Sequence, residues 1–139
     1  MALIKSLLAL LLGAFLLSAG ASHLGSNRTE FLAQVPTWLP LDPDFVVIAS
    51  GLVEITLGAL LIITALILKK YCGVIGLITA VFFILIFPGN INQYVNHLDG
   101  FGLDTDTKRF IRLLFQPPLV ALALWCSDGL RLLKKLKQI

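Results

Sequence analysis

The sequence predicts an all-α integral membrane protein, a four-helix bundle whose helices span the bilayer, and three observations support this class. The chain of 139 residues is 58% hydrophobic and only 14% charged, whereas a soluble domain is about one quarter charged. A chain this short cannot hide so much apolar surface inside one water-facing domain. Its apolar residues gather in four long stretches, and its basic residues gather at the ends of those stretches.

The four predicted spans make residues 1–139 a single transmembrane domain; they cover about residues 3–23, 45–68, 71–88 and 108–127. A helix needs roughly 20 mostly apolar residues to cross the hydrocarbon core, because each residue adds about 1.5 Å. The second stretch has this length by itself, and the others reach it with flanking residues. The first stretch also fits a cleaved secretory signal, because Lys5 precedes an apolar run that ends in Ala19-Gly20-Ala21. Both interpretations of that stretch stay open.

The basic residues predict the orientation of the bundle. Most of them lie near the amino end, at Lys5, in the short turn Lys69-Lys70, and in the tail, at Arg131, Lys134, Lys135 and Lys137. The two longer loops contain Arg28, Lys108 and Arg109, together with more numerous acidic residues. The positive-inside rule places such segments in the cytoplasm, so we expect both termini there and the two longer loops outside. This basicity predicts contact with anionic lipid and not with nucleic acid.

The first outer loop contains a predicted short helix in the membrane interface. Asn27 fits its N-cap, and Glu30 stands three residues later, where a capping box has its carboxylate. Trp38 suits the level of the lipid headgroups. In the second outer loop, we expect Asp106 or Thr107 to cap the last span.

Glu54 lies about ten residues into the second span. An unpaired carboxylate at this depth costs on the order of several kcal/mol. Gly51 and Gly58 fall on the same side of the helix, and small residues in spanning helices mark close helix contacts. We therefore expect Glu54 to point into the bundle. It is either part of a proton, ion or ligand site or a structural polar lock between helices.

Polar residues of the other spans fall at the same end of the bundle. Arg112 and Gln116 share one face of the last span, and the two prolines that follow predict a kink there. Asn90 and His23 stand at the outer ends of the third and first spans. The sequence thus predicts a cavity that opens outward, with ligand-binding residues Glu54, Gln116, Arg112, Asn90 and His23. A hydrogen-bonded network that binds nothing is the structural alternative.

Other kinds of site find little support. Cys72 and Cys126 form no CxxC pair and have no histidine cluster near them, which argues against a thioredoxin-type centre or a zinc site. No Walker, GxGxxG, GxSxG or HExxH motif is present, and no nucleophile with its base can be assembled. We therefore predict no catalytic residue, no metal ligand and no bound cofactor except, in one hypothesis below, a quinone.

Five short motifs lie in order on the predicted spans and loops: AGASH at 19–23, VPTWLP at 35–40, SGLVE at 50–54, FPGNI at 87–91 and RLLFQ at 112–116. With them the chain resembles the DoxX-like family of small bacterial membrane proteins, from the first span to Trp125. The family positions are His23, Gly51, Glu54, Pro88, Asn90, Arg112 and Gln116, and Gly89 stands where the family usually has alanine. The resemblance implies a four-helix bundle in the bacterial cytoplasmic (inner) membrane. The family name comes from a link to a thiosulfate:quinone oxidoreductase, but most members have no assigned activity.

Three hypotheses for function follow. The leading one is a non-catalytic or accessory membrane protein that holds a small, partly lipophilic ligand. Glu54 and Gln116 would bind the polar end of the ligand, Arg112 would set the local charge, and His23 and Asn90 would line the mouth. The second is a membrane subunit of a quinone-linked oxidoreductase, with a redox partner protein. The third is a small proton-coupled transporter, although the sequence has no visible inverted repeat.

Overall fold

The computed structural model describes residues 2–138, and every regular element in this range is a helix. Four segments have the length and composition of membrane spans, as in a multi-pass membrane protein: Ala2–Leu24, Pro43–Leu66, Lys69–Val95 and Asp106–Cys126. The predicted all-α bundle with four spans is therefore confirmed. The elements are α1 (Ala2–Leu24), α2 (Arg28–Leu32), α3 (Pro43–Leu66), η1 (Lys69–Tyr71), α4 (Cys72–Val95), α5 (Asp106–Leu114), α6 (Gln116–Cys126) and α7 (Gly129–Leu136).

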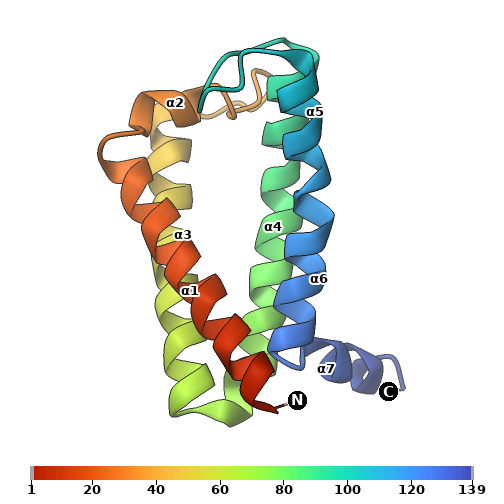
Figure 1. Cartoon of the computed structure of the whole chain (residues 1–139). Helices are drawn as coiled ribbons and strands as arrows, with labels where there is room; N and C mark the ends of the chain where they lie inside the picture. Colours follow the sequence, from red (N-terminus) through yellow and green to blue (C-terminus); the bar gives the residue numbers. More distant parts are fainter. Residues whose placement is uncertain (1, 139) are drawn as a thin grey trace.

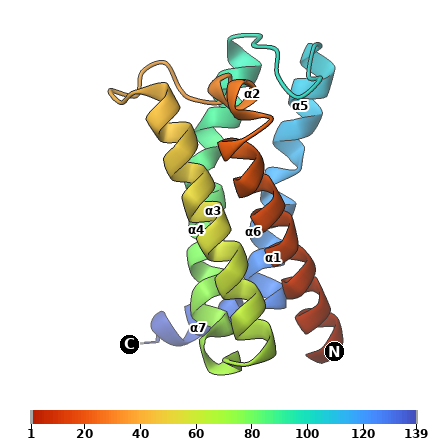
Figure 2. The same ribbon diagram turned by 90° about the vertical axis from the view of Figure 1, so that its left-hand side faces the viewer.

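The four spans pack as two pairs (Figures 1 and 2). Helix α1 packs against α3, and α4 packs against the last span, which consists of α5 and α6. The pairs meet near the two chain termini and diverge toward the other end, where α2 and the long loops lie (Figure 1). We call these the terminal end and the loop end. Because the terminal end also carries η1, all the segments that the sequence assigned to one side of the membrane lie together.

Two glycine contacts hold α1 against α3. A Cβ atom on Gly58 would lie 2.6 Å from the carbonyl oxygen of Gly13, and one on Gly51 would lie 2.6 Å from Cβ of His23. Only glycine permits backbones to approach this closely in a spanning helix pair. The close helix contact predicted from Gly51 and Gly58 is thus confirmed, and it turns the Glu54 side chain toward the interior, where the residue is buried.

The apolar core fills the terminal half of the bundle. Its buried members include Leu12, Leu16, Leu57, Leu61 and Phe83. The buried polar side chains of this half, Thr64, Thr79 and Ser127, bond to backbone carbonyls of their own helical segments. Most of the buried polar side chains lie toward the loop end, including His23, Glu54, Asn90, Arg109 and Gln116.

The third span is longer than predicted, because α4 continues through Pro88 and ends at Val95. Proline lacks an N–H and usually weakens a helix at this point. Neighbouring segments hold the extra turns from the side: the side-chain amide of Asn92 donates to the Val35 carbonyl (3.3 Å), and that of Gln93 donates to the Gly100 carbonyl (3.4 Å). Such outside partners explain why the prediction of an end at residue 88 was wrong.

The last span is broken in the middle. Helix α5 ends at Leu114 and α6 begins at Gln116, with prolines in its first turn. The predicted kink is confirmed. The cap of this span is Thr105, whose hydroxyl accepts a hydrogen bond from the Lys108 N–H (3.3 Å), and not Asp106 or Thr107. The helix starts one residue earlier than expected, so the residue before Asp106 holds the capping position.

Candidate functional site

A cavity of about 460 Å³ lies between the two helix pairs toward the loop end, and its wall contains all five residues that the sequence assigned to a ligand site. Five helices supply them: His23 comes from α1, Glu54 from α3, Asn90 from α4, Arg112 from α5 and Gln116 from α6. Most of the remaining wall is apolar. It includes Leu16, Val47, Phe83, Ile86 and Leu119.

Glu54 and His23 face each other in this wall. The Oε2 atom of Glu54 lies 3.4 Å from Nε2 of His23, and the two residues are 6% and 5% exposed. The other ring nitrogen, Nδ1, lies 3.1 Å from the Val47 carbonyl and 3.0 Å from the Ser50 hydroxyl. Since a carbonyl only accepts, we assign the Nδ1 proton to the bond with Val47.

This assignment leaves the second ring nitrogen facing a carboxyl oxygen. Two acceptors do not attract each other, so a favourable contact between them would need one more proton, on Glu54 or on the ring of His23. The 3.4 Å separation is within the range of an ion pair, but it does not form a hydrogen bond, and Oε2 of Glu54 has no hydrogen-bond partner among residues 2–138. A buried oxygen without a partner costs about 1–3 kcal/mol, which makes it a place where a donor would bind.

Gln116 is bonded on both sides of its amide. Its Nε2 donates to the Phe83 carbonyl (2.6 Å), and its Oε1 accepts from Nδ2 of Asn90 (3.3 Å) and from Nη1 of Arg112 (3.4 Å). These contacts tie α4, α5 and α6 together at the break in the last span. Gln116 and Asn90 are therefore engaged within the protein, and they orient Arg112 toward the cavity.

Arg112 keeps most of its hydrogen-bonding capacity. In the described chain it makes a single side-chain bond, the 3.4 Å contact with Gln116, and it forms no ion pair with Glu54. Arg109, one turn earlier, is the opposite case, because it is 5% exposed and binds Asp99, Asp106 and the Leu98 carbonyl. Their spacing of three residues puts both arginines on one face of α5, but only Arg112 lines the cavity.

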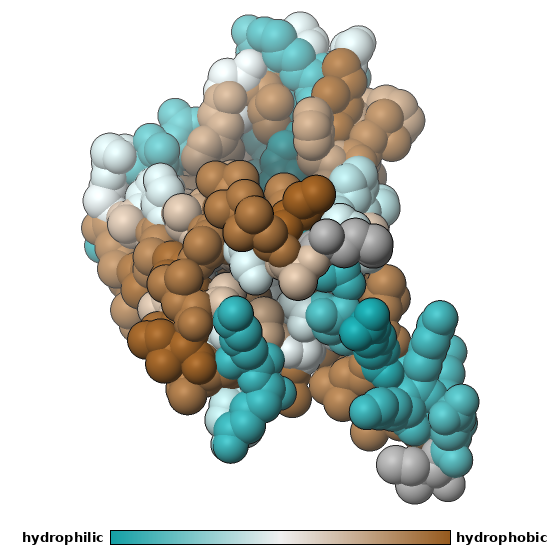
Figure 3. Space-filling view, turned by 60° about the horizontal axis from the view of Figure 1, so that its bottom comes forward, coloured by the Kyte–Doolittle hydropathy of each residue, from teal (hydrophilic) through white to brown (hydrophobic). Residues whose placement is uncertain are grey.

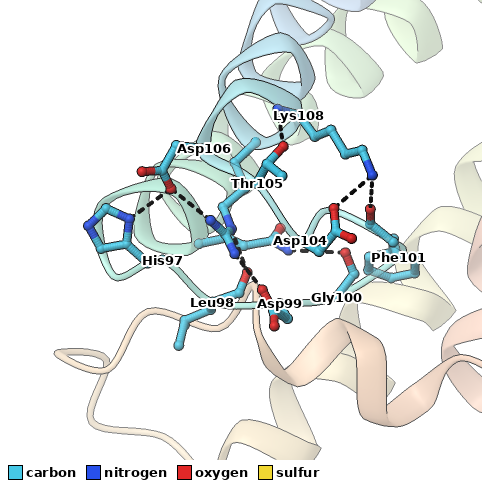
Figure 4. A network of polar contacts seen from close by, with 12 residues as sticks. His97, Leu98, Asp99, Gly100, Phe101, Asp104, Thr105, Asp106 and Lys108 are labelled. Carbon is cyan, nitrogen blue, oxygen red and sulfur yellow. Dashed lines mark hydrogen bonds and ion pairs between the residues drawn. The ribbon is translucent and has the colours of Figure 1, made fainter.

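Figure 4 shows the polar network of the loop between α4 and α5, which Arg109 joins through Leu98, Asp99 and Asp106. His97 pairs with Asp106 (2.8 Å), and Lys108 pairs with Asp104 (2.7 Å). The hydrogen bond from Lys108 is the main reason why the pKa of Asp104 lies below its usual range. Polar contacts within one short segment thus give this loop a defined path.

The fixed loop lies against α2 and covers the loop end of the cavity. The Phe101 N–H donates to the Glu30 carboxylate, and the Phe101 ring packs edge-on against Phe31 (4.6 Å between centroids). Phe31 in turn packs on His23. The predicted capping box is therefore wrong, because Asn27 makes no side-chain cap and Glu30 binds the second loop instead.

His23 and Asn90 were expected to line an outward opening, and both are buried wall residues near α2 and the second loop. Exposed side chains also line the cavity, and one of them is Trp38, which is 69% exposed. Phe15 of α1 and Leu85 of α4 line the cavity as well and remain 52% and 71% exposed, at the level of the hydrocarbon-facing helix surfaces.

Comparison with known proteins gives one match. Residues 12–127 match the model of a family described as a domain of unknown function (DUF8561). No curated protein matches the chain, and no solved structure matches it. The matched segment contains every residue of the cavity wall, from Phe15 to Leu119. Because the match covers well over half of the sequence, the chain belongs to the family described as a domain of unknown function (DUF8561).

Proposed function

We propose that this protein binds a small, partly lipophilic ligand in the cavity between Glu54 and Arg112, and that it does so as a non-catalytic or accessory membrane protein. One observation carries the proposal: a buried carboxyl oxygen without a hydrogen-bond partner faces an apolar cavity that also contains a largely unengaged guanidinium group. If Glu54 and Arg112 served only to join helices, the carboxyl and the guanidinium group would both be fully hydrogen-bonded within the protein. Ionisable residues inside a spanning bundle that are not bonded in this way are candidates for a functional site.

The wall chemistry defines the ligand class. The polar end needs a donor for Oε2 of Glu54 and an acceptor for Arg112, and a hydroxyl group supplies both. The body meets Leu16, Val47 and Phe83, so it is apolar. A volume of about 460 Å³ lies within the range of roughly 300–1,000 Å³ that is common for small-molecule sites.

The side of the cavity gives such a ligand a route. Exposed Phe15 and Leu85 border it, and these helix surfaces would face acyl chains in a bilayer. A lipophilic molecule therefore enters from the membrane without passing α2 or the loop between α4 and α5. The same opening lets an apolar tail remain in the bilayer while the polar end stays inside.

The proposal includes an orientation. Lys5, Lys69 and Lys70 lie at the terminal end with the basic tail, which favours a cytoplasmic position for both termini by the positive-inside rule. The loop end, with α2 and the exposed Trp38, then lies at the outer headgroup level. The DoxX-like resemblance supports a bacterial cytoplasmic membrane as the location.

A quinone or quinol is a specific version of this ligand, and it supports the second candidate, a membrane subunit of a quinone-linked oxidoreductase. A quinol hydroxyl would donate to Glu54, a quinone carbonyl would accept from Arg112, and the isoprenoid tail would leave beside Leu85. Glu54 and His23, whose facing atoms lie 3.4 Å apart, would take up or release the proton that the quinone oxygen gains or loses. A redox partner protein would supply or take the electrons.

Native mass spectrometry of gently solubilised protein tests the proposal. We expect the wild type to carry a small lipophilic molecule, and extraction with absorbance spectra would identify a quinone. Glu54→Leu should lose it, because the acceptor disappears while the side-chain volume is nearly kept. Thr56→Val is the matched control on the same helix, since Thr56 is exposed and bonded only to its own backbone. Equal occupancy in the wild type and Glu54→Leu, or an empty wild type, would overturn the proposal.

A further inference from the structure

A second pocket, of about 350 Å³, lies at the terminal end of the bundle. The first turn of α1, the end of α3, η1, the start of α4 and helix α7 surround it. Figure 3 brings this end toward the viewer and shows hydrophilic side chains on two sides of a paler hollow. The pocket is far from the Glu54 cavity along the helices, and it shares no wall residue with it.

The charge of this pocket is strongly positive. Its described lining contains one acid, Asp128, and five basic side chains, Lys5, Lys69, Lys70, Arg131 and Lys135. Lys5 already pairs with Asp128 (2.5 Å), and Arg131 approaches the same carboxylate only to 3.6 Å. Lys69, Lys70 and Lys135 form no ion pair with any residue of the range 2–138. The carboxylate of Asp128 is therefore already paired, and the positive charges of Lys69, Lys70 and Lys135 have no acidic partner in the described chain.

Helix α7 forms one side of the pocket, so the basic tail of the sequence is a helix that contributes to this site. After α6 the chain reverses at Asp128, which has a positive φ of 64°, and α7 then leaves the bundle sideways (Figures 1 and 2). Its Leu132 and Leu133 are partly buried, while Lys134 and Lys135 are exposed. An amphipathic helix of this kind lies in the plane of a membrane surface.

The surroundings indicate what kind of anion fits. The floor contains the hydroxyls of Thr64 and Ser127, both of which already bond to backbone carbonyls, so a ligand is held mainly by charge. Beside the basic rim, Leu66, Ile67 and Leu68 stay exposed on the helix ends. A molecule with an anionic head and apolar chains meets both surfaces at once, whereas a free phosphate ion meets only the first.

We propose that this pocket binds the phosphate-bearing headgroup of an anionic phospholipid, with Lys69 and Lys70 on one side and Arg131 and Lys135 on the other. The acyl chains run along the apolar ends of α3 and α4. Basic pockets between spanning helices on the cytoplasmic side suit such headgroups. Binding there fixes α7 against the bundle, because the lipid bridges α7 and η1.

Tryptophan fluorescence gives a local test. Trp125 lies at the terminal end, 5.4 Å from Nζ of Lys5, and the other tryptophan, Trp38, lies at the loop end. In a Trp38→Phe background, quenching of Trp125 by brominated phosphatidylglycerol is compared with quenching by brominated phosphatidylcholine. We expect the anionic lipid to be preferred by about thirtyfold or more, because each nearby basic residue contributes a factor of about five and more than two basic residues line the pocket.

Two matched variants separate the pocket from diffuse charge. Lys69→Gln with Lys70→Gln removes two charges from the wall, and Lys134→Gln with Lys137→Gln removes two from outside it. The first pair should reduce the preference by roughly tenfold to thirtyfold, and the second by about twofold at most. Equal effects of the two pairs, or no preference in the parent protein, would overturn the proposal. Loss of the preference in inorganic phosphate, against chloride of equal ionic strength, would show a free-anion site instead of a lipid site.

Discussion

Glu54 of α3 and His23 of α1 bring a carboxyl oxygen and a ring nitrogen to 3.4 Å, and that oxygen still has no hydrogen-bond partner in the described chain. A pair that served only to lock two helices would gain by closing this distance. The glycine contacts between α1 and α3 already hold the helices together without it. This geometry is the observation that motivates the proposed ligand site.

The first prediction concerns stability without ligand. Glu54→Leu should unfold at the same temperature as the delipidated wild type or higher, because it removes a buried polar atom whose lack of a partner costs about 1–3 kcal/mol. Thermal unfolding in detergent measures this. Gln93→Leu is the contrasting variant, since Gln93 is 1% exposed and its amide is bonded, and it should lose about 1–3 kcal/mol. A large loss of stability in Glu54→Leu would instead identify a structural lock.

The second prediction separates the two arginines. Arg112→Gln should keep the fold but lower ligand occupancy by about tenfold to a hundredfold, as expected for the loss of a charged hydrogen bond of about 1.5–3 kcal/mol. Arg109→Gln should retain occupancy more fully but loosen the loop at 96–105, because its guanidinium holds Asp99 and the Leu98 carbonyl. Hydrogen exchange of that loop, measured beside native mass spectrometry, distinguishes the two effects. The same loss of ligand in both variants would contradict the assignment.

The third prediction tests the α1–α3 contact. Gly58→Ala places a methyl group 2.6 Å from the Gly13 carbonyl oxygen, and overpacking of this kind costs about 1–3 kcal/mol. Gly25→Ala should be nearly neutral, because the nearest atom is 3.7 Å away. Thermal unfolding of the two variants in the same detergent checks this. If Gly58→Ala is as stable as Gly25→Ala, the backbones of α1 and α3 do not approach each other as closely as the structure shows.

The fourth prediction concerns the pH dependence of the Asp104–Lys108 pair in the loop between α4 and α5. The hydrogen bond from Lys108 lowers the pKa of Asp104, so the contribution of this pair is present above the usual carboxyl pKa and is lost as the pH falls through the lowered value. Lys108→Ala should raise the pKa of Asp104 toward the usual range, as measured by carboxyl NMR titration. Lys134→Ala, at the other end of the molecule, should leave it unchanged. Since Asp104 is exposed, we expect the effect in the loop and not in global stability.

Composition and spacing along the chain determined the broad architecture. The length of the apolar stretches defines four spans, because a helix of given length crosses the bilayer whatever its neighbours are. The glycines beside Glu54 placed that carboxyl inside, since helical periodicity relates residues on one helix. The five residues predicted for the site do share one wall, because each lies toward the same end of its span.

Only the tertiary structure decided which side chains meet. Arg109 and Arg112 look alike on one helix face, yet Leu98 and Asp99 of the preceding loop bind the first, and the second remains in the cavity wall. Glu30 fits a local capping box, but the nearby Phe101 N–H takes its carboxylate. The extension of α4 beyond Pro88 likewise depends on partners from another segment. Periodicity specifies a face, whereas pairing across helices depends on loop paths and close packing, which no local pattern contains.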